Sequence, residues 1–152
     1  MLCASVWPPM IEQWRELIET VARRNGLDPS LLAAIVQVES GGDRDAVRCE
    51  DWLGVCSYGL MQIVDFDWRR LTLEQLLDPD FNVDMGTFIL SESIRQGGSI
   101  RRGLAVYNCG LEGVRTNRCG KHGGYAYADK ALRLCREYGG CVPPTIGRHF
   151  VQ

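Results

Sequence analysis

The chain has 152 residues, of which 45% are hydrophobic and 24% are charged, and its formal net charge is -2. This length suits one domain that buries its own core, so we expect a single domain over 1–152 that acts as a monomer. The near-neutral charge gives no general attraction to nucleic acid or to an anionic membrane, and we expect neither as a partner.

Helical periodicity dominates the first forty residues. In MIEQWRELIETVARRNG (10–26), apolar residues recur at spacings of three and four, and Gly26 predicts the end of the helix. In DPSLLAAIVQVESGG (28–42), Asp28 is the predicted N-cap and Pro29 takes the first helical position. Two glycines predict where this second helix ends.

The middle of the chain is less regular. Residues 43–57 hold several acidic residues, two cysteines and little periodicity, which predicts a loop or a small β region. The segment SYGLMQIVDFDWRRL (57–71) predicts a helical turn or short helix. TLEQLL (72–77) predicts a brief helix that Thr72 caps and that ends before Pro79.

Three longer helices are predicted in the second half. They cover NVDMGTFILSESIRQGG (82–98), IRRGLAVYNCG (100–110) after the cap Ser99, and YAYADKALRLCREY (125–138). The apolar face of the first of them is predicted at Val83, Met85, Phe88, Ile89 and Ile94. The tail over 139–152 is predicted to be irregular. Taken together, the predicted elements give a mainly α fold.

Seven cysteines are unusual for this length. Three pairs lie close in the sequence, namely Cys49 with Cys56, Cys109 with Cys119, and Cys135 with Cys141. This pairing leaves Cys3 over and is one of many connectivities. Such density indicates an oxidising, extracytoplasmic compartment. A zinc site at Cys109, Cys119 and His122 is the alternative, although a paired C-x-x-C spacing is lacking, and we expect no metal and no cofactor.

The route to that compartment is not encoded in an obvious way. No stretch has the length of a transmembrane span. The start MLCASVWPPMIEQW lacks the basic region and the long apolar region of a signal peptide. We therefore expect either that a signal has been removed or that the chain leaves by another route, such as release with a phage.

One apolar helix, LLAAIVQVESGG (31–42), ends on a carboxylate. At about 100° per residue, Leu32, Ile35 and Val36 fall on the same side as Glu39. Burial beside them and the partial negative charge at a helix C-terminus should both raise the pKa of Glu39. A carboxyl group that keeps its proton near neutral pH can protonate a glycosidic oxygen. The alternative is a helix-terminal glutamate that bends out to water.

Four motifs occur in order along the chain: ESGG, SYGLMQI, AVYNCG and YAYADKAL. Together they resemble the lytic transglycosylase family with the lysozyme-like fold, over about residues 27–138. The resemblance implies an α+β lysozyme-like domain with a cleft. It also implies cleavage of the β-1,4 bond between N-acetylmuramic acid and N-acetylglucosamine in peptidoglycan. Glu39 would then act as general acid and afterwards as base, which closes a 1,6-anhydro ring on the muramoyl sugar.

The same resemblance implies a set of glycan-binding residues. These are Ser57, Gly59, Met61, Gln62, Tyr107, Asn108 and Tyr127. Each has a purely structural alternative. Met61 and the two tyrosines can be core residues, Gln62 can be a surface amide, and Asn108 can cap a helix.

Several features leave the function open. The segment VDFDWRRL (64–71) departs from the family pattern, so the resemblance implies no particular contacts on that side of the groove. A second carboxylate opposite Glu39 would favour hydrolysis by a muramidase, and the candidates are Asp43, Asp45, Glu50 and Asp51. A non-catalytic wall-binding or virion module is a further alternative. We expect peptidoglycan strands as partner, with a phage virion or a secretion apparatus as a second.

Overall fold

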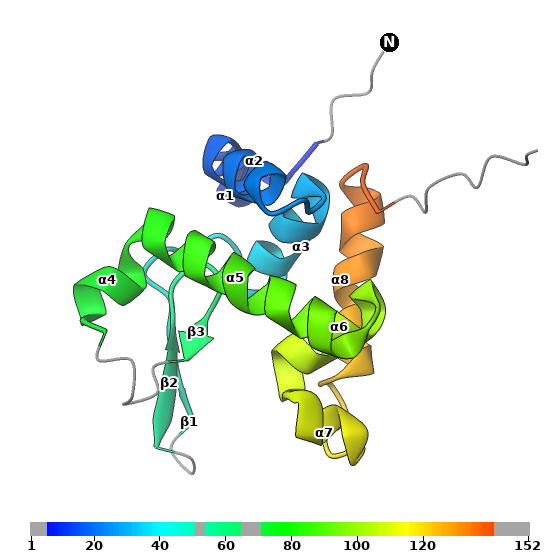
Figure 1. Cartoon of the computed structure of the whole chain (residues 1–152). Helices are drawn as coiled ribbons and strands as arrows, with labels where there is room; N and C mark the ends of the chain where they lie inside the picture. The colour runs from blue at the N-terminus through cyan, green and yellow to red at the C-terminus, as the bar shows by residue number, and fades with distance from the viewer. Residues whose placement is uncertain (1–5, 51–53, 65–70, 142–152) are drawn as a thin grey trace, which may run out of the picture.

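The structure is a computed structural model, and it describes residues 6–50, 54–64 and 71–141 (Figure 1). Its elements are α1 (Pro9–Glu12), α2 (Arg15–Arg24), α3 (Pro29–Ser40), β1 (Val47–Glu50), β2 (Val55–Tyr58), β3 (Ile63–Val64), α4 (Leu73–Leu77), α5 (Pro79–Gly97), α6 (Ile100–Cys109), α7 (Leu111–Arg115) and α8 (Tyr125–Glu137). The strands form one antiparallel sheet in the order β1-β2-β3. This arrangement confirms the predicted fold class, mainly helical with a small β region.

The predicted first helix is divided in two. α1 ends at Glu12 and α2 begins at Arg15, so the prediction of one continuous helix is wrong at Gln13 and Trp14. The break has a structural use, because the Trp14 indole Nε1 donates a 2.9 Å hydrogen bond to the carbonyl of Gly42. This bond ties the N-terminal helices to the end of α3.

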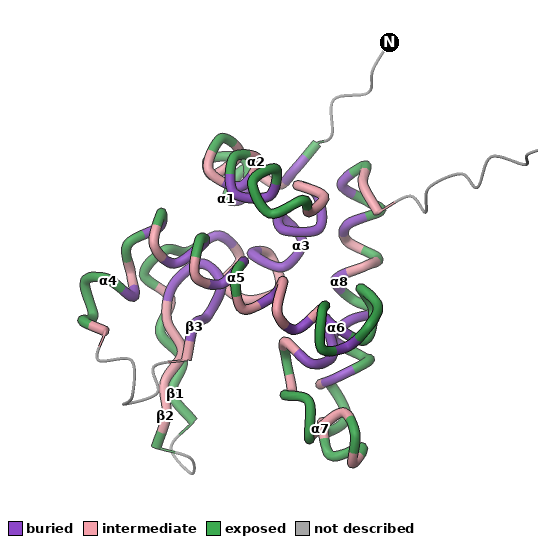
Figure 2. Tube along the Cα trace, in the orientation of Figure 1, coloured by how far each residue is buried: buried purple, intermediate pink, exposed green. Residues whose placement is uncertain are grey.

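α3 is the central helix of the core. The predicted cap is confirmed, since Asp28 accepts a 2.8 Å hydrogen bond from the backbone N–H of Ser30. The predicted end is confirmed as well, with Gly41 in the left-handed region at φ 65°. Residues 31–36 are buried on every side, as Figure 2 shows, because α2 and α8 both pack on this helix. The sequence pattern predicted burial of one face only.

The helical turn predicted over 57–71 is wrong where the structure describes it. Ser57 and Tyr58 pair with strand β1, and the chain then turns into β3. Gly59 and Gln62 have φ values of 75° and 49°, in the left-handed region that a helix of L residues does not adopt. Residues 65–70 lie outside the described part of the chain.

Three disulfides join the predicted neighbours, namely Cys49–Cys56, Cys109–Cys119 and Cys135–Cys141. The predicted pairing is therefore confirmed, and Cys3 lies outside the described residues. The zinc alternative is wrong, because the sulfurs of Cys109 and Cys119 are bonded to each other and are not thiolate ligands.

The predicted apolar face of α5 is confirmed at Val83, which is fully buried, and at Ile94, which packs against the core, but it is wrong at Phe88. The buried residues of α5 include Val83, Gly86 and Leu90, at spacings of three and four. Phe88, predicted on the buried face, is 61% exposed. Gly86 explains why this face of α5 points to the core. A Cβ at this position would collide with the side chain of Met61, so only glycine lets α5 come this close to the turn that carries Met61.

Helices α4, α6 and α8 follow their predictions. Thr72 and Gln75 form a capping box at α4, and Ser99 caps α6 by accepting from the N–H of Arg102. α7 is a short helix that was not predicted from the sequence. None of the helices in the described ranges is long and apolar enough to cross a membrane.

Candidate active site

A groove of about 920 Å³ runs between the small sheet and helices α5 and α6. In Figure 1 the sheet lies on one side below α5, and α6 and α7 lie on the other side. Its walls carry apolar, polar and charged side chains from all three strands and both helices. The volume and the mixed lining are typical of a ligand site.

Glu39 stands in this groove, on the last turn of α3. The side chain is half-buried, and Tyr127 on α8 donates a 2.6 Å hydrogen bond to its Oε1. Burial raises the pKa of Glu39 to about 7, although the Tyr127 hydrogen bond and the positive charge of Arg48 both lower it. The rise in the pKa of Glu39 agrees with the sequence prediction. Near neutral pH both the protonated and the ionised form of this carboxyl group are populated.

Two tyrosine hydroxyls accompany this carboxyl group. Tyr107 donates a 2.9 Å hydrogen bond to the carbonyl of Met61, and Tyr127 donates to Glu39. Burial and the negative charge of Glu39 raise the pKa of both tyrosines well above their ordinary value. Both hydroxyls therefore keep their protons near neutral pH and act as hydrogen-bond donors there.

The turn over 59–62 is held by the amide of Gln62. Its Nε2 donates to the carbonyls of Ala46 (3.1 Å) and Gly59 (3.0 Å). Its Oε1 accepts a 2.8 Å hydrogen bond from Ser57 Oγ. These contacts compensate the positive φ of Gln62, and they engage most of its hydrogen-bonding capacity inside the protein.

Asn82 on α5 holds the same turn from the side of that helix. Its Oδ1 accepts from the N–H of Met61 at 2.8 Å, and its Nδ2 donates to the carbonyls of Tyr58 (2.8 Å) and Leu76 (2.7 Å). Asn82 is fully buried and abuts Gly59, where a Cβ would collide with the amide. Sequence reasoning missed this residue, although a polar side chain within the buried period of α5 was a usable signal.

The predicted site residues separate into two groups. Glu39, Ser57, Gln62, Tyr107 and Asn108 line the groove. The other three lie beneath it: Gly59, Met61 and Tyr127 are buried and do not line it. The fully buried Met61 packs against α5, as its structural alternative predicted.

Many of the residues that line the groove were not predicted as site residues, and Arg48, Phe88 and Ile89 are among them. Arg48 projects from β1, in a segment that offered no motif. Phe88 and Ile89 line the wall formed by α5, where sequence periodicity had assigned them to the core.

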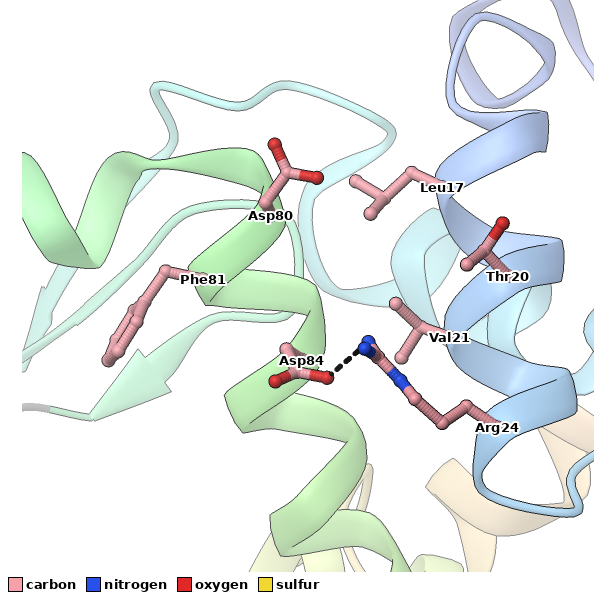
Figure 3. Close-up of a pocket in the computed structure, with 7 residues that line it drawn as sticks. All are labelled: Leu17, Thr20, Val21, Arg24, Asp80, Phe81 and Asp84. Carbon is pink, nitrogen blue, oxygen red and sulfur yellow. Dashed lines mark hydrogen bonds and ion pairs between the residues drawn. The ribbon is translucent and has the colours of Figure 1, made fainter.

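A second hollow, of about 380 Å³, lies between α2 and α5 (Figure 3). An ion pair of 2.8 Å between the exposed side chains of Arg24 and Asp84 crosses it. None of the predicted site residues lines this hollow, and the groove around Glu39 is therefore the better candidate for an active site.

Comparison with known sequences agrees with this geometry. The sequence model of the family described as "Transglycosylase SLT domain" matches residues 16–127, which include Glu39, the turn over 59–62 and Tyr107. The chain belongs to the transglycosylase SLT domain family. The match ends at Tyr127, so the family segment includes both partners of the 2.6 Å hydrogen bond.

Individual SLT relatives are similar over part of their length. A transglycosylase of Enterobacteria phage PRD1 is 32% identical over 98 residues, which are 64% of this chain and 35% of that protein. An endo-type membrane-bound lytic murein transglycosylase A of Salmonella paratyphi B is 31% identical over 85 residues, 52% of this chain and 42% of that protein. The match thus spans less than half the length of each of these two relatives.

The SLT domain also has a counterpart of known structure. An inactive mutant of the lytic transglycosylase Slt from Pseudomonas aeruginosa superposes with a TM-score of 0.69 and 24% sequence identity. The match covers 86% of this chain and 24% of that one. This likeness agrees with the lysozyme-like fold that the four motifs predicted.

Proposed function

We propose that this protein is a peptidoglycan lytic transglycosylase that cleaves the bond between N-acetylmuramic acid and N-acetylglucosamine. The observation that carries the proposal is a half-buried Glu39 in an open groove, with a pKa of about 7 and a tyrosine donor at 2.6 Å. Membership of the SLT family and the names of its relatives support the reaction class.

The proposed reaction uses Glu39 twice. Its carboxyl group first donates a proton to the oxygen that links C1 of the muramoyl sugar to O4 of N-acetylglucosamine, and the C1–O4 bond breaks. The acetamido group of the muramoyl sugar stabilises the positive charge at C1. The 6-hydroxyl oxygen then bonds to C1, and its proton returns to the Glu39 carboxylate. The product carries a 1,6-anhydro ring, and no water is consumed.

A pKa near 7 suits both steps, because the same group must be acid and then base at one pH. Tyr127 supports the step in which Glu39 acts as a base. Its hydrogen bond to Oε1 stabilises the Glu39 carboxylate after the proton has been donated. We therefore assign Tyr127 as a positioning residue and Glu39 as the catalytic residue.

The alternative function is hydrolysis by a muramidase, which needs a second carboxylate across the sugar. Of the predicted candidates, Glu50 lines the groove, Asp43 and Asp45 do not, and Asp51 lies outside the described residues. No acidic side chain of the described ranges is among the groups that shift the pKa of Glu39. Membership of the SLT family favours the transglycosylase, and Glu50 is the described residue that would serve a hydrolase.

The proposed place of action is the bacterial cell wall, outside the cytoplasm. Three disulfides support an oxidising compartment. A phage transglycosylase among the relatives supports a virion as the setting of the proposed reaction, with a secretion apparatus as the alternative.

The test is digestion of purified peptidoglycan, followed by mass spectrometry of the soluble muropeptides. We expect products that end in 1,6-anhydromuramic acid, and their loss in Glu39→Gln. Glu16→Gln, at an exposed position on α2, is the matched control and should keep full activity. Reducing-end products that disappear in Glu50→Gln would identify a muramidase instead. No release of muropeptides would favour a non-catalytic wall-binding module.

A further inference from the structure

Arg48 is fixed in the wall of the groove by the sheet. It lies on β1 opposite Ser57 on β2, and the neighbouring pair Cys49 and Cys56 is joined by a disulfide. Side chains alternate along a strand, so Arg48 and Glu50 share one face, and both line the groove. The backbone of Arg48 is thus held in place while its side chain remains exposed.

Arg48 also differs in charge from the rest of the groove. Among the described residues that line it, Arg48 is the one cation, whereas Glu39, Glu50 and Glu92 are acidic. Glu92 is already bound by Arg95 at 2.7 Å. Arg48 itself makes no ion pair with any residue in the described ranges, so its guanidinium is available to a ligand in the groove.

The positive charge of Arg48 acts on the carboxyl group of Glu39, which is the proposed reacting centre. Arg48 is near enough to Glu39 for its field to act on that carboxyl group and lower its pKa. Arg48 and Glu39 also line the same groove, so a ligand anion held by Arg48 occupies the groove in which Glu39 would act. An arginine guanidinium binds a carboxylate through two parallel hydrogen bonds, which fixes its orientation as well as its charge.

We propose that Arg48 binds a carboxylate carried by the muramoyl sugar or its peptide stem. This inference rests on the proposed function and adds a basis for choosing the substrate. Muramic acid carries a lactyl carboxyl group, which is free in strands without stems and bound as an amide in strands with acidic peptide stems. A chain of N-acetylglucosamine alone has neither, so Arg48 would distinguish muramoyl sugars from neutral ones.

The test measures binding without turnover, in a Glu39→Gln background. The probes are soluble glycan strands stripped of stems, strands that retain them, and both kinds with every carboxylate converted to a methylamide. Titration calorimetry gives Kd for each probe. Arg48→Gln is compared with Arg48→Lys and with Arg44→Gln, which removes an equal charge from a residue that does not line the groove.

We expect Arg48→Gln to raise Kd about tenfold for an anionic probe, as the loss of one charge-assisted contact does, and to leave the methylamide probes unaffected. Arg48→Lys should recover part of the affinity, and Arg44→Gln should match the parent. A loss confined to stripped strands identifies the free lactyl carboxylate as the ligand group. A loss confined to strands with stems identifies a stem carboxylate.

Two outcomes overturn the inference, and they differ from each other. If anionic and methylamide probes weaken equally in Arg48→Gln, or neither weakens, Arg48 does not bind a carboxylate, while the proposed function stands. If no probe binds even with Arg48 present, the proposed function fails and the inference fails with it.

Discussion

The hydroxyl of Tyr127 donates a 2.6 Å hydrogen bond to Oε1 of Glu39 across a sequence separation of 88 residues. This bond opposes the effect of burial, because it stabilises the charged carboxylate that burial disfavours. The two effects leave the pKa of Glu39 at about 7, between the value of an exposed carboxyl group and that of a wholly desolvated one. α8 therefore adjusts the acidity of a group that α3 carries.

Tyr127→Phe tests this balance. The change removes the donor and keeps the ring, so the pKa of Glu39 should rise further, by about one unit. The basic limb of the kcat profile should move up in pH by that amount, and kcat at neutral pH should fall about tenfold as Glu39 loses its fixed orientation. A pH–rate profile of glycan release measures both.

The control for this change is Tyr125→Phe on the same helix. Tyr125 is 39% exposed, contacts Arg101 and does not line the groove, so the profile should not move. An unchanged profile in Tyr127→Phe would contradict the role assigned to the hydroxyl.

Glu39→Gln should stabilise the protein, increasingly so at higher pH. The folded pKa of about 7 lies above the ordinary 4.5, so the folded state holds a proton that the unfolded state releases in this range. The free energy of unfolding of the parent therefore falls as pH rises from about 4.5 through 7, and glutamine does not titrate. After allowance for partial contact with water, we expect the variant to gain about 1 to 2 kcal/mol between pH 4 and pH 8.

Urea titrations of both proteins at pH 4 and pH 8 measure this difference. Glu16→Gln, an exposed residue, supplies the control and should show no such gain. Equal stability of parent and Glu39→Gln at both pH values would mean that the carboxyl group is solvated in the folded state.

The sequence predicted the parts of the site that local rules determine. Asp28 and Gly41 mark the ends of α3 by capping chemistry, and the helical period then places Glu39 beside apolar neighbours. Other parts depend on tertiary contacts that no local pattern contains. The left-handed Gln62 is stable because its own amide reaches Ala46, and Phe88 is exposed because α5 turns Gly86 toward the core.

Asn82 should be essential for the stability of the turn beneath the groove. Asn82→Ala leaves one N–H and two carbonyls without partners in a buried place, at a cost of about 1 to 3 kcal/mol for each group that water cannot reach. We expect a loss of about 3 kcal/mol or more in the free energy of unfolding. Asn82→Asp retains the acceptor for the N–H of Met61 but cannot donate, so it should also destabilise. A loss below 1 kcal/mol in both variants would show that the three groups find other partners.

Phe88→Ala should weaken glycan binding without weakening the fold. The ring is 61% exposed on the wall of the groove, so its removal takes little apolar surface out of the core. A sugar face packed on this ring would lose that contact, and we expect KM to rise about threefold to tenfold with kcat unchanged. Ile100→Ala, at a position 47% exposed and outside the groove, is the control. An unchanged KM would mean that the glycan does not reach this wall.

The Cys109–Cys119 disulfide should hold the end of the groove formed by α7. It closes a segment with a sequence separation of 10, for which chain-entropy arguments give about 2 to 3 kcal/mol. Cys109, Gly110 and Leu111 all line the groove, so opening this loop changes a wall of the site without touching the contact between Glu39 and Tyr127.

We therefore expect the Cys109→Ser and Cys119→Ser double variant to show faster amide hydrogen exchange over 109–124 and a higher KM, while the pH dependence of kcat stays as in the parent. The matched control replaces Cys135 and Cys141 with serine, which removes a disulfide of similar span at the far end of α8. The Cys135 and Cys141 double variant should have a lower free energy of unfolding than the parent and the same KM. A pH profile that moves in the Cys109 variant would show that the loop also positions Glu39, through the Gly124 N–H that donates a 2.8 Å hydrogen bond to Asn108 at the start of α8.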